Sequence, residues 1–386
     1  MNLTRFREMP IVLRNGFKAR KIPRRRAMRM LRALALCSLA LVSPAGGRAR
    51  AEGAETAVPA KPDPAIEMMK PCSEGNDPEL QAIACTELLT GGRLSGPQMT
   101  AAYVFRGKAN AARQQLPAAI ADFTSALKLD PRAADALYNR GATHALVGRY
   151  DLALQDFGKV LEMAPNDADT LYYRAGIYAL QGRDDAAIKD LTTVLKQHPE
   201  DPLSLVDRGG IYIRVGKFDA AIQDFTALLK VNAKSADSYY NRGRAYFLKG
   251  DFKAAAADFD AAMQNRAENP YAAIRLYLAR LRAGKPDLKP LQEAVAKYDP
   301  EQWPLPLAAL ILGKVSEVDL LQAIQVKDPA VALSLSCETH FYLGELALAK
   351  GDKAAAARQF QAAIASTSRG SIEYIDATLE LKKLGK

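Results

Sequence analysis

The sequence predicts an all-α solenoid, in which short antiparallel helix pairs stack side by side. A small residue recurs every 34 positions from Gly107 to Gly243, and a fixed period of this length is typical of repeat proteins. A glycine followed by a charged residue recurs midway, which predicts a turn between two helices. The small, alanine and bulky columns are Gly107, Gly141, Ala175, Gly209, Gly243; Ala119, Ala153, Ala187, Ala221, Ala255; and Phe123, Phe157, Leu191, Phe225, Phe259.

Each column has a physical reason. Where the two helices cross, Gly or Ala lets the backbones approach, and the bulky residue fills the space between neighbouring units. One pair cannot bury its apolar face alone, so units must stack into a continuous core. This pattern is identified as the tetratricopeptide repeat (TPR), which implies five repeats over residues 100–269 and a right-handed superhelix with a concave and a convex side.

Two charged columns run in the same phase. An arginine precedes each small residue and an aspartate precedes each bulky one. We expect a ladder of ion pairs joining the two helices within or between units, which fixes geometry more than it adds stability. The columns are Arg106, Arg140, Arg174, Arg208, Arg242 and Asp122, Asp156, Asp190, Asp224, Asp258.

Residues 1–51 have the order of a secretory signal peptide. A basic run around Arg24-Arg25-Arg26 precedes an apolar stretch from Ala33 to Val42, and cleavage is expected after Ala51. The apolar stretch is too short for a transmembrane anchor. The arginines also fit a twin-arginine signal, Cys37 resembles a lipoprotein cleavage site, and translation from Met28 or Met30 is an alternative start. We predict a periplasmic protein, with an envelope lipoprotein as the alternative.

The leader explains the net charge of +10. It holds 13 of the 53 basic residues and 1 of the 43 acidic ones, which leaves 40 basic against 42 acidic residues in the rest. The basic balance is therefore a property of the leader, and it does not predict binding to nucleic acid.

Residues 52–71 are rich in Ala, Pro, Glu and Lys and are predicted to be a flexible linker. Cys72 and Cys85 follow, and in an exported chain they are expected to form a disulfide, the alternative being two buried thiols. Because Gln81 to Thr86 imitates the second helix of a repeat, residues 72–99 are predicted to be a degenerate half-repeat that caps the solenoid. A Cys pair leading into such repeats resembles exported TPR proteins of alphaproteobacterial type.

The first helices of the pairs are predicted to carry the ligand site. In TPR proteins generally, ligands lie along the concave face that these helices form. Tyrosine gives broad, stiff contact area and asparagine can pair with a peptide backbone, so we expect a peptide or a partner helix as the ligand. The alternative is that these tyrosines pack against the next unit. The predicted exposed positions are Tyr138, Asn139, Tyr172, Tyr173, Asp207, Tyr240, Asn241 and Arg244.

One TPR subclass grips a terminal carboxylate with basic and amide side chains on three successive first helices. Lys108 and Asn139 match that pattern, but Asp169 and Tyr173 stand where a basic pair belongs. The sequence therefore argues against a carboxylate clamp.

The C-terminal third is less regular. Residues 270–336 are interrupted by Pro286 and Pro290 and are predicted to be an irregular helical insert. A final repeat is expected at 337–366, and a capping helix at 371–384. Trp303, the stretch Leu312 to Glu317 and the stretch Cys337 to Gly344 resemble the NlpI class of TPR lipoproteins. That resemblance implies an envelope adaptor, often a homodimer, that binds peptidoglycan hydrolases and a periplasmic protease.

Catalysis is not predicted. The three histidines, His144, His198 and His340, lie at no metal-ligand spacing, and no nucleophile and base are paired. We expect no enzyme activity, no metal and no cofactor. The predicted function is a non-catalytic adaptor or scaffold for a cell-envelope partner, with a peptidoglycan-binding module or a structural subunit of an envelope complex as alternatives.

Overall fold

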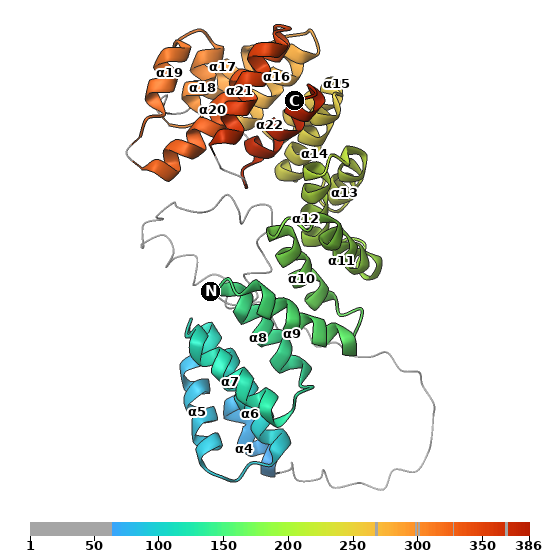
Figure 1. Ribbon diagram of the computed structural model, residues 1–386, viewed down its shortest axis with the longest axis vertical. Coiled ribbons are helices and arrows are strands. Elements are labelled where there is room, and N and C mark those ends of the chain that lie inside the picture. The colour runs from blue at the N-terminus through green and yellow to red at the C-terminus, as the bar shows by residue number, and fades with distance from the viewer. Residues whose placement is uncertain (1–63, 267–268, 298, 300–301, 327, 367–369) are drawn as a thin grey trace.

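The structure is a computed structural model that describes residues 64–386 apart from 267–268, 298, 300–301, 327 and 367–369. The part described is helical, without a strand, and forms an elongated coil of helix pairs (Figure 1), as the sequence predicts. The predicted leader lies outside the described residues. The helices are α4 (Pro64–Ser73), α5 (Pro78–Thr90), α6 (Gly96–Ala112), α7 (Leu116–Leu129), α8 (Ala134–Leu146), α9 (Tyr150–Met163), α10 (Ala168–Leu180), α11 (Asp184–Gln197), α12 (Pro202–Arg214), α13 (Phe218–Val231), α14 (Ala236–Lys249), α15 (Phe252–Asn265), α16 (Pro270–Arg282), α17 (Lys289–Val295), α18 (Leu305–Ile311), α19 (Glu317–Ala323), α20 (Pro329–Ala349), α21 (Lys353–Ala365) and α22 (Ile372–Lys383).

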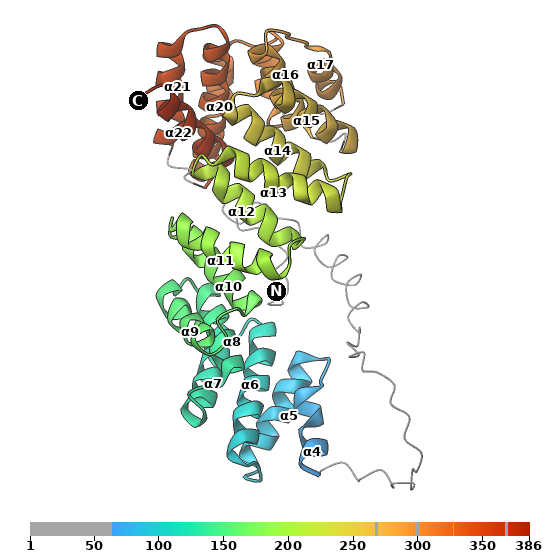
Figure 2. The same cartoon turned by 90° about the vertical axis from the view of Figure 1, so that its right-hand side faces the viewer.

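Five hairpins, from α6·α7 to α14·α15, correspond to the five predicted repeats. The turn glycines are needed for their backbone conformation: Gly148, Gly182 and Gly216 have φ of 77°, 72° and 77°, which Gly adopts without a Cβ clash. In the first hairpin Gln114 holds the same position with φ of 61°. The first helices line the inner side of the arc and the second helices its outer side (Figures 1 and 2).

The small and bulky columns meet as predicted. A Cβ built on Gly107 would lie 2.6 Å from Phe123 Cε1, and one on Gly209 would lie 2.9 Å from Phe225 Cζ. In the third hairpin the small residue is Ala175 and the bulky one is Leu191, both fully buried. Alanine has one methyl group more than glycine, and the bulky residue facing it is leucine, which is smaller than phenylalanine. Close packing requires this compensation.

The charged columns form the predicted ladder, and every rung lies within one hairpin. Each arginine guanidinium is paired with the aspartate sixteen residues later, across the two helices of its own unit. The aspartates are buried and the arginines are partly buried, so the pairs set the crossing geometry at little net gain in stability. The rungs are Arg106–Asp122 (2.6 Å), Arg140–Asp156 (2.7 Å), Arg174–Asp190 (2.7 Å), Arg208–Asp224 (2.7 Å) and Arg242–Asp258 (2.8 Å).

A second bond links each rung to the preceding unit. Nη1 of Arg208 donates to Thr192 Oγ1 at 3.0 Å, and Arg140 and Arg242 make the same bond to the helix before them. Arg174 lacks this bond among the described residues, because Gly158 stands where the first, third and fourth units have Thr124, Thr192 and Thr226. The ladder therefore has one unfilled inter-unit position.

Replacing Gly158 with Thr is expected to fill that position. A Cβ at Gly158 meets nothing within 4 Å among the described residues, so the side chain fits. Gly158→Val is the matched control, because valine has the same shape and branching without the hydroxyl. The free energy of unfolding in urea should be about 0.5–1.5 kcal/mol higher for the threonine variant than for the valine variant, which is the net contribution of one hydrogen bond. Equal stabilities would show that the inter-unit bond contributes nothing.

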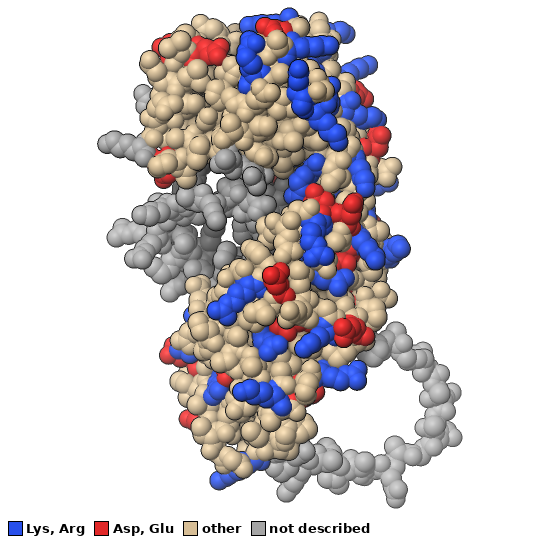
Figure 3. Space-filling view, viewed as in Figure 1, with Lys and Arg blue, Asp and Glu red and all other residues tan. Residues whose placement is uncertain are grey.

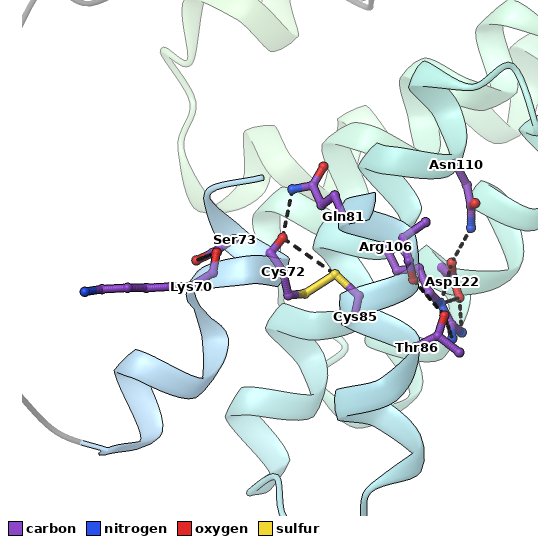
Figure 4. Close-up of a disulfide and its surroundings, with 10 residues drawn as sticks. Lys70, Cys72, Ser73, Gln81, Cys85, Thr86, Arg106, Asn110 and Asp122 are labelled. Atoms are coloured by element: carbon purple, nitrogen blue, oxygen red, sulfur yellow. Dashed lines mark hydrogen bonds and ion pairs between the residues drawn. A yellow bond between two sulfur atoms is a disulfide. The ribbon is translucent and has the colours of Figure 1, made fainter. Parts of the chain in front are cut away.

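The N-terminal cap contains the predicted disulfide between Cys72 and Cys85, which joins α4 to α5 (Figure 4). Thr86 of α5 accepts from Arg106 Nη1 at 3.2 Å, the role that threonines play in the repeats. The interpretation of α5 as the second helix of a half-repeat agrees with that bond. The predicted linker is wrong at its end, because α4 begins at Pro64 and is held on α5 by the disulfide.

The described residues of the C-terminal third form helices α16 to α22 and the loops between them. Four helices, α16 to α19, occupy the predicted insert, and α20 begins at Pro329, eight residues before the predicted start of the final repeat. Gly344 meets Phe360 as the small and bulky columns do, so α20 and α21 form a repeat-like hairpin. Helix α22 packs on α20 and α21 and also touches α12 and α14. It thereby lies against the inner side of the arc (Figure 1).

Candidate partner-binding face

The inner face is formed by the first helices α6, α8, α10, α12 and α14 (Figure 1). The 34-residue period places the same helix face inward in each unit, so the eight predicted site residues come from four successive helices. These helices are α8, α10, α12 and α14. The role of the eight residues in binding remains a prediction.

The expectation that all eight side chains are exposed is wrong. Asn139, Tyr172, Tyr173, Asp207 and Arg244 are buried, whereas Tyr138, Tyr240 and Asn241 are partly buried. The reason is that an inward side chain at this spacing also reaches the next unit. The inner face therefore consists of partly covered side chains with a small accessible area each.

Two kinds of contact cover these residues. The Tyr172 hydroxyl donates to Asp207 Oδ2 of the next first helix at 2.8 Å. Tyr138 packs against Tyr173 with ring centroids 5.8 Å apart. These contacts match the packing alternative for the tyrosines, and they give the inner face a stiff, partly aromatic surface.

Arg244 holds α22 on the inner face. Its Nη2 lies 2.6 Å from Asp376 Oδ1, and Nη1 of Arg275 lies 2.9 Å from Asp376 Oδ2. All three side chains are at most 2% exposed. Leu379, one turn further along α22, packs on a cluster of buried residues from α11, α12, α13 and α14. An acidic residue and an apolar residue of one helix face thus bind to the inner side of two repeats.

Sequence analysis missed this pairing. It singled out Arg244 as an exposed ligand residue, yet its partner is 132 residues away in a helix without the repeat period. The available signal was the change from Ala142, Gly176 and Gly210 in the second to fourth units to Arg244 in the fifth; the first unit also has a charged residue, Lys108, at this position. A charge that replaces small residues in a repeat indicates a contact outside the repeat.

Helix α20 carries two further carboxyl groups, those of the partly buried Glu338 and the buried Glu345. Glu338 accepts from Trp303 Nε1 at 2.6 Å and from the Tyr271 hydroxyl at 2.9 Å. Burial, with repulsion from Glu373, raises the pKa of Glu338 to about 7. Burial, with repulsion from Glu380, raises the pKa of Glu345 to about 8, against the opposing effect of Arg282, whose Nη1 lies 2.6 Å from Glu345 Oε2. Both carboxyl groups are therefore protonated in the folded chain at a pH where they ionise in the unfolded chain.

This difference predicts that the C-terminal third loses stability as pH rises. The folded state keeps protons that the unfolded chain releases above about pH 4.5, so stability falls between about pH 5 and pH 8 and then levels off. The loss is measured as a falling free energy of unfolding in urea at pH 5, 6.5 and 8. Glu345→Gln should flatten the profile, whereas Glu162→Gln on the exposed side of α9 should leave it unchanged. A wild-type slope retained in Glu345→Gln would contradict this assignment.

Metal binding would require a cluster of ligating side chains. No group of three or more His, Cys, Asp or Glu side chains in the part of the chain that the structure describes could hold a metal ion. His340 Nδ1 is bonded to Gln359 Oε1 at 2.7 Å, and burial lowers the pKa of His144. Burial raises the pKa of the buried thiol of Cys337. Within the same residues, no helix is both long and apolar enough to span a membrane.

The exposed charges are mixed in sign. In the view of Figure 3, Lys and Arg lie among Asp and Glu over the right-hand side of the molecule. That face carries interspersed charges and not a single basic stripe. Several of the charges are paired, among them Lys249 with Asp219 at 2.6 Å.

Comparison with solved structures found the following similarities. One is with YrrB, described as a TPR protein with an unusual peptide-binding site, at 22% identity over 50% of this chain and 96% of that chain (TM-score 0.45). Another is with a TPR protein from Parabacteroides merdae, at 19% identity over 75% and 100% of the two chains (TM-score 0.48). A third is with pilF of Pseudomonas aeruginosa, at 18% identity over 56% and 98% (TM-score 0.45).

Family models match the repeats themselves. Models described as tetratricopeptide repeat match residues 134–167, 169–201 and 206–273, and one described as TPR repeat matches residues 107–148. The matched residues run from the first small residue, Gly107, into α16, and they coincide with the hairpins, the ladder and the small and bulky columns of the structure. The hairpins within residues 107–273 are therefore tetratricopeptide repeats.

Proposed function

We propose that this protein is a non-catalytic adaptor of the cell envelope, which holds a peptide or a helix of a partner protein on its inner face. The observation that carries the proposal is α22, which is seated on α12 and α14 through Asp376 and Leu379. A surface that binds one helix of its own chain has the shape and chemistry for a helix of another. Helix-in-groove binding uses anchors at this kind of spacing.

Further features support the fold class and the location. TPR proteins are generally non-catalytic adaptors that bind protein or peptide partners. The disulfide between Cys72 and Cys85 favours an oxidising compartment, and the predicted leader favours export to the periplasm. By the resemblance of the C-terminal third, the proposed partners are a peptidoglycan hydrolase or a periplasmic protease, and a homodimer is part of the same proposal.

Site-specific photo-crosslinking tests the adaptor role. A benzophenone amino acid is placed at Asn241 on the inner face and, as the matched control, at Lys189 on the outer helix α11, in cells that export the full chain. We expect adducts from position 241 that are absent from position 189. Adducts from position 189 alone, or the same adducts from both, would overturn the proposal. Binding of muropeptides without any protein adduct would favour the glycan-binding alternative.

A further inference from the structure

One inner-face column changes residue type in the fourth repeat. Three positions before each small residue, the second, third and fifth repeats have Tyr138, Tyr172 and Tyr240. The fourth repeat has Val206 at this position. The first repeat has Val104 there, and Tyr103 packs against the same cluster. The fourth repeat is thus the interior unit that lacks an aromatic ring at this position.

The tyrosine normally covers the bulky residue of its own unit. The ring centroids of Tyr138 and Phe157 are 6.1 Å apart, and those of Tyr240 and Phe259 are 5.5 Å apart. Phe225 is the corresponding residue of the fourth repeat, where the facing side chain is valine. Valine is shorter than tyrosine, so no ring stands at this position, although Phe225 itself is buried by its other neighbours (1% exposed).

A cavity of about 310 Å³ lies at that place. Its volume is at the lower end of the range for ligand pockets in proteins. Leu228 and Phe225 form part of its lining, Val231 is half-exposed beside it, and Ile372, the first residue of α22, contributes to its wall. Other lining residues include Val206 and Asn241. The cavity is mainly apolar and continues the surface on which α22 is seated.

The charges around the cavity are already compensated. Arg244 lines it, but its guanidinium is paired with Asp376 at 2.6 Å. Asp237 pairs with Arg266 at 3.4 Å, and both side chains are exposed. Asn241 Nδ2 donates to the Asp237 carbonyl oxygen at 2.9 Å. A charged side chain entering this cavity would lose water without gaining a counter-charge, so the lining favours an uncharged one.

We infer that this cavity binds one aromatic side chain of the partner segment, and that Val206 determines this specificity. The incoming ring lies against Val206, at the repeat position where the second unit has its own Tyr138, and meets the edge of Phe225 that lines the cavity. The inference rests on the proposed function, because a partner segment must lie along the inner face to deliver the ring. It adds the chemical class of the anchor residue and its position in the fourth repeat.

The test uses the mature full-length chain and two capped pentapeptides, acetyl-Ala-Ala-Phe-Ala-Ala-amide and the same peptide with Ala at the centre. Methyl NMR follows Leu228, Val231 and Ile372 during titration. The phenylalanine peptide is expected to shift these resonances, and the alanine peptide is not. In Val206→Tyr the variant's own ring should fill the space and weaken binding at least tenfold, while the melting temperature stays level or rises, because tyrosine is native at this position in three other repeats.

Two control variants separate the anchor from general effects. Val231→Lys places a charge beside the cavity and should also weaken binding, whereas Leu129→Lys, at the same repeat position in α7, should not. Equal binding of the two peptides, or wild-type binding by Val206→Tyr, would overturn the inference. If photo-crosslinking from position 241 succeeds while the cavity binds neither peptide, the adaptor role stands and the aromatic anchor fails. If the phenylalanine peptide binds but no inner-face adduct forms, the adaptor role is contradicted, whereas the preference of the cavity for an aromatic side chain is not.

Discussion

Asp376→Asn is expected to destabilise the C-terminal third by about 3–5 kcal/mol, the cost of leaving buried charges without their partner. Asp376 is the shared counter-ion of Arg244 and Arg275, and both guanidinium groups are buried under α22. Arg275 keeps a second partner, Glu373, at 3.4 Å, so the charge left unpaired is that of Arg244. Asparagine has nearly the same shape, so the change removes charge and little packing. The measurement is hydrogen exchange of α22 and α20, because repeat arrays need not unfold in one step.

Asp219→Asn is the control for this experiment. Asp219 pairs with Lys249 at 2.6 Å, but its side chain is 75% exposed, so solvent screens the pair. This variant should exchange like the wild type. Wild-type protection of α22 in Asp376→Asn would contradict the assignment of the buried pair as the anchor of this helix.

Gly107→Ala is expected to destabilise the first hairpin by about 1–3 kcal/mol, the usual cost of overpacking a close-packed core. The new methyl carbon would lie 2.6 Å from Phe123 Cε1, which is closer than two carbons can pack. Phe123→Leu alone should also destabilise, by leaving a void. Circular dichroism during urea unfolding measures each variant.

The double variant tests whether the small and bulky columns are coupled. The third hairpin already combines Ala175 with Leu191, so Gly107→Ala with Phe123→Leu should be more stable than the sum of the single effects by about 1 kcal/mol or more. Gly158→Ala, where a Cβ meets open space, is the control for added methyl groups and should not destabilise. Strict additivity in the double variant would show that the two columns do not constrain each other.

The repeats could be predicted in detail because the period makes each position face the same surroundings five times. Gly107 and Phe123, or Arg106 and Asp122, are informative only because their equivalents recur in phase. The disulfide followed from the spacing of two cysteines and the expected compartment. The repeat columns and the disulfide could therefore be predicted from the sequence alone.

The inner face was harder to predict. Side chains such as Tyr172 and Asp207 were expected to be exposed, but each reaches a neighbouring unit, and their distance from it is set by packing. The position of α22 depends on the ion pair between Arg244 and Asp376, which are 132 residues apart. No repeat period relates these two segments. The cavity at Val206 required both the repeat alignment and the ring positions in space.

The central claim is that partners bind to the inner face of the first helices. Hydrogen–deuterium exchange of the full chain, with and without the partner captured from position 241, measures it most directly. We predict that the partner slows exchange in α10, α12 and α14 and leaves α11 and α13 unchanged. Slower exchange confined to the outer helices α11 and α13 would contradict the account.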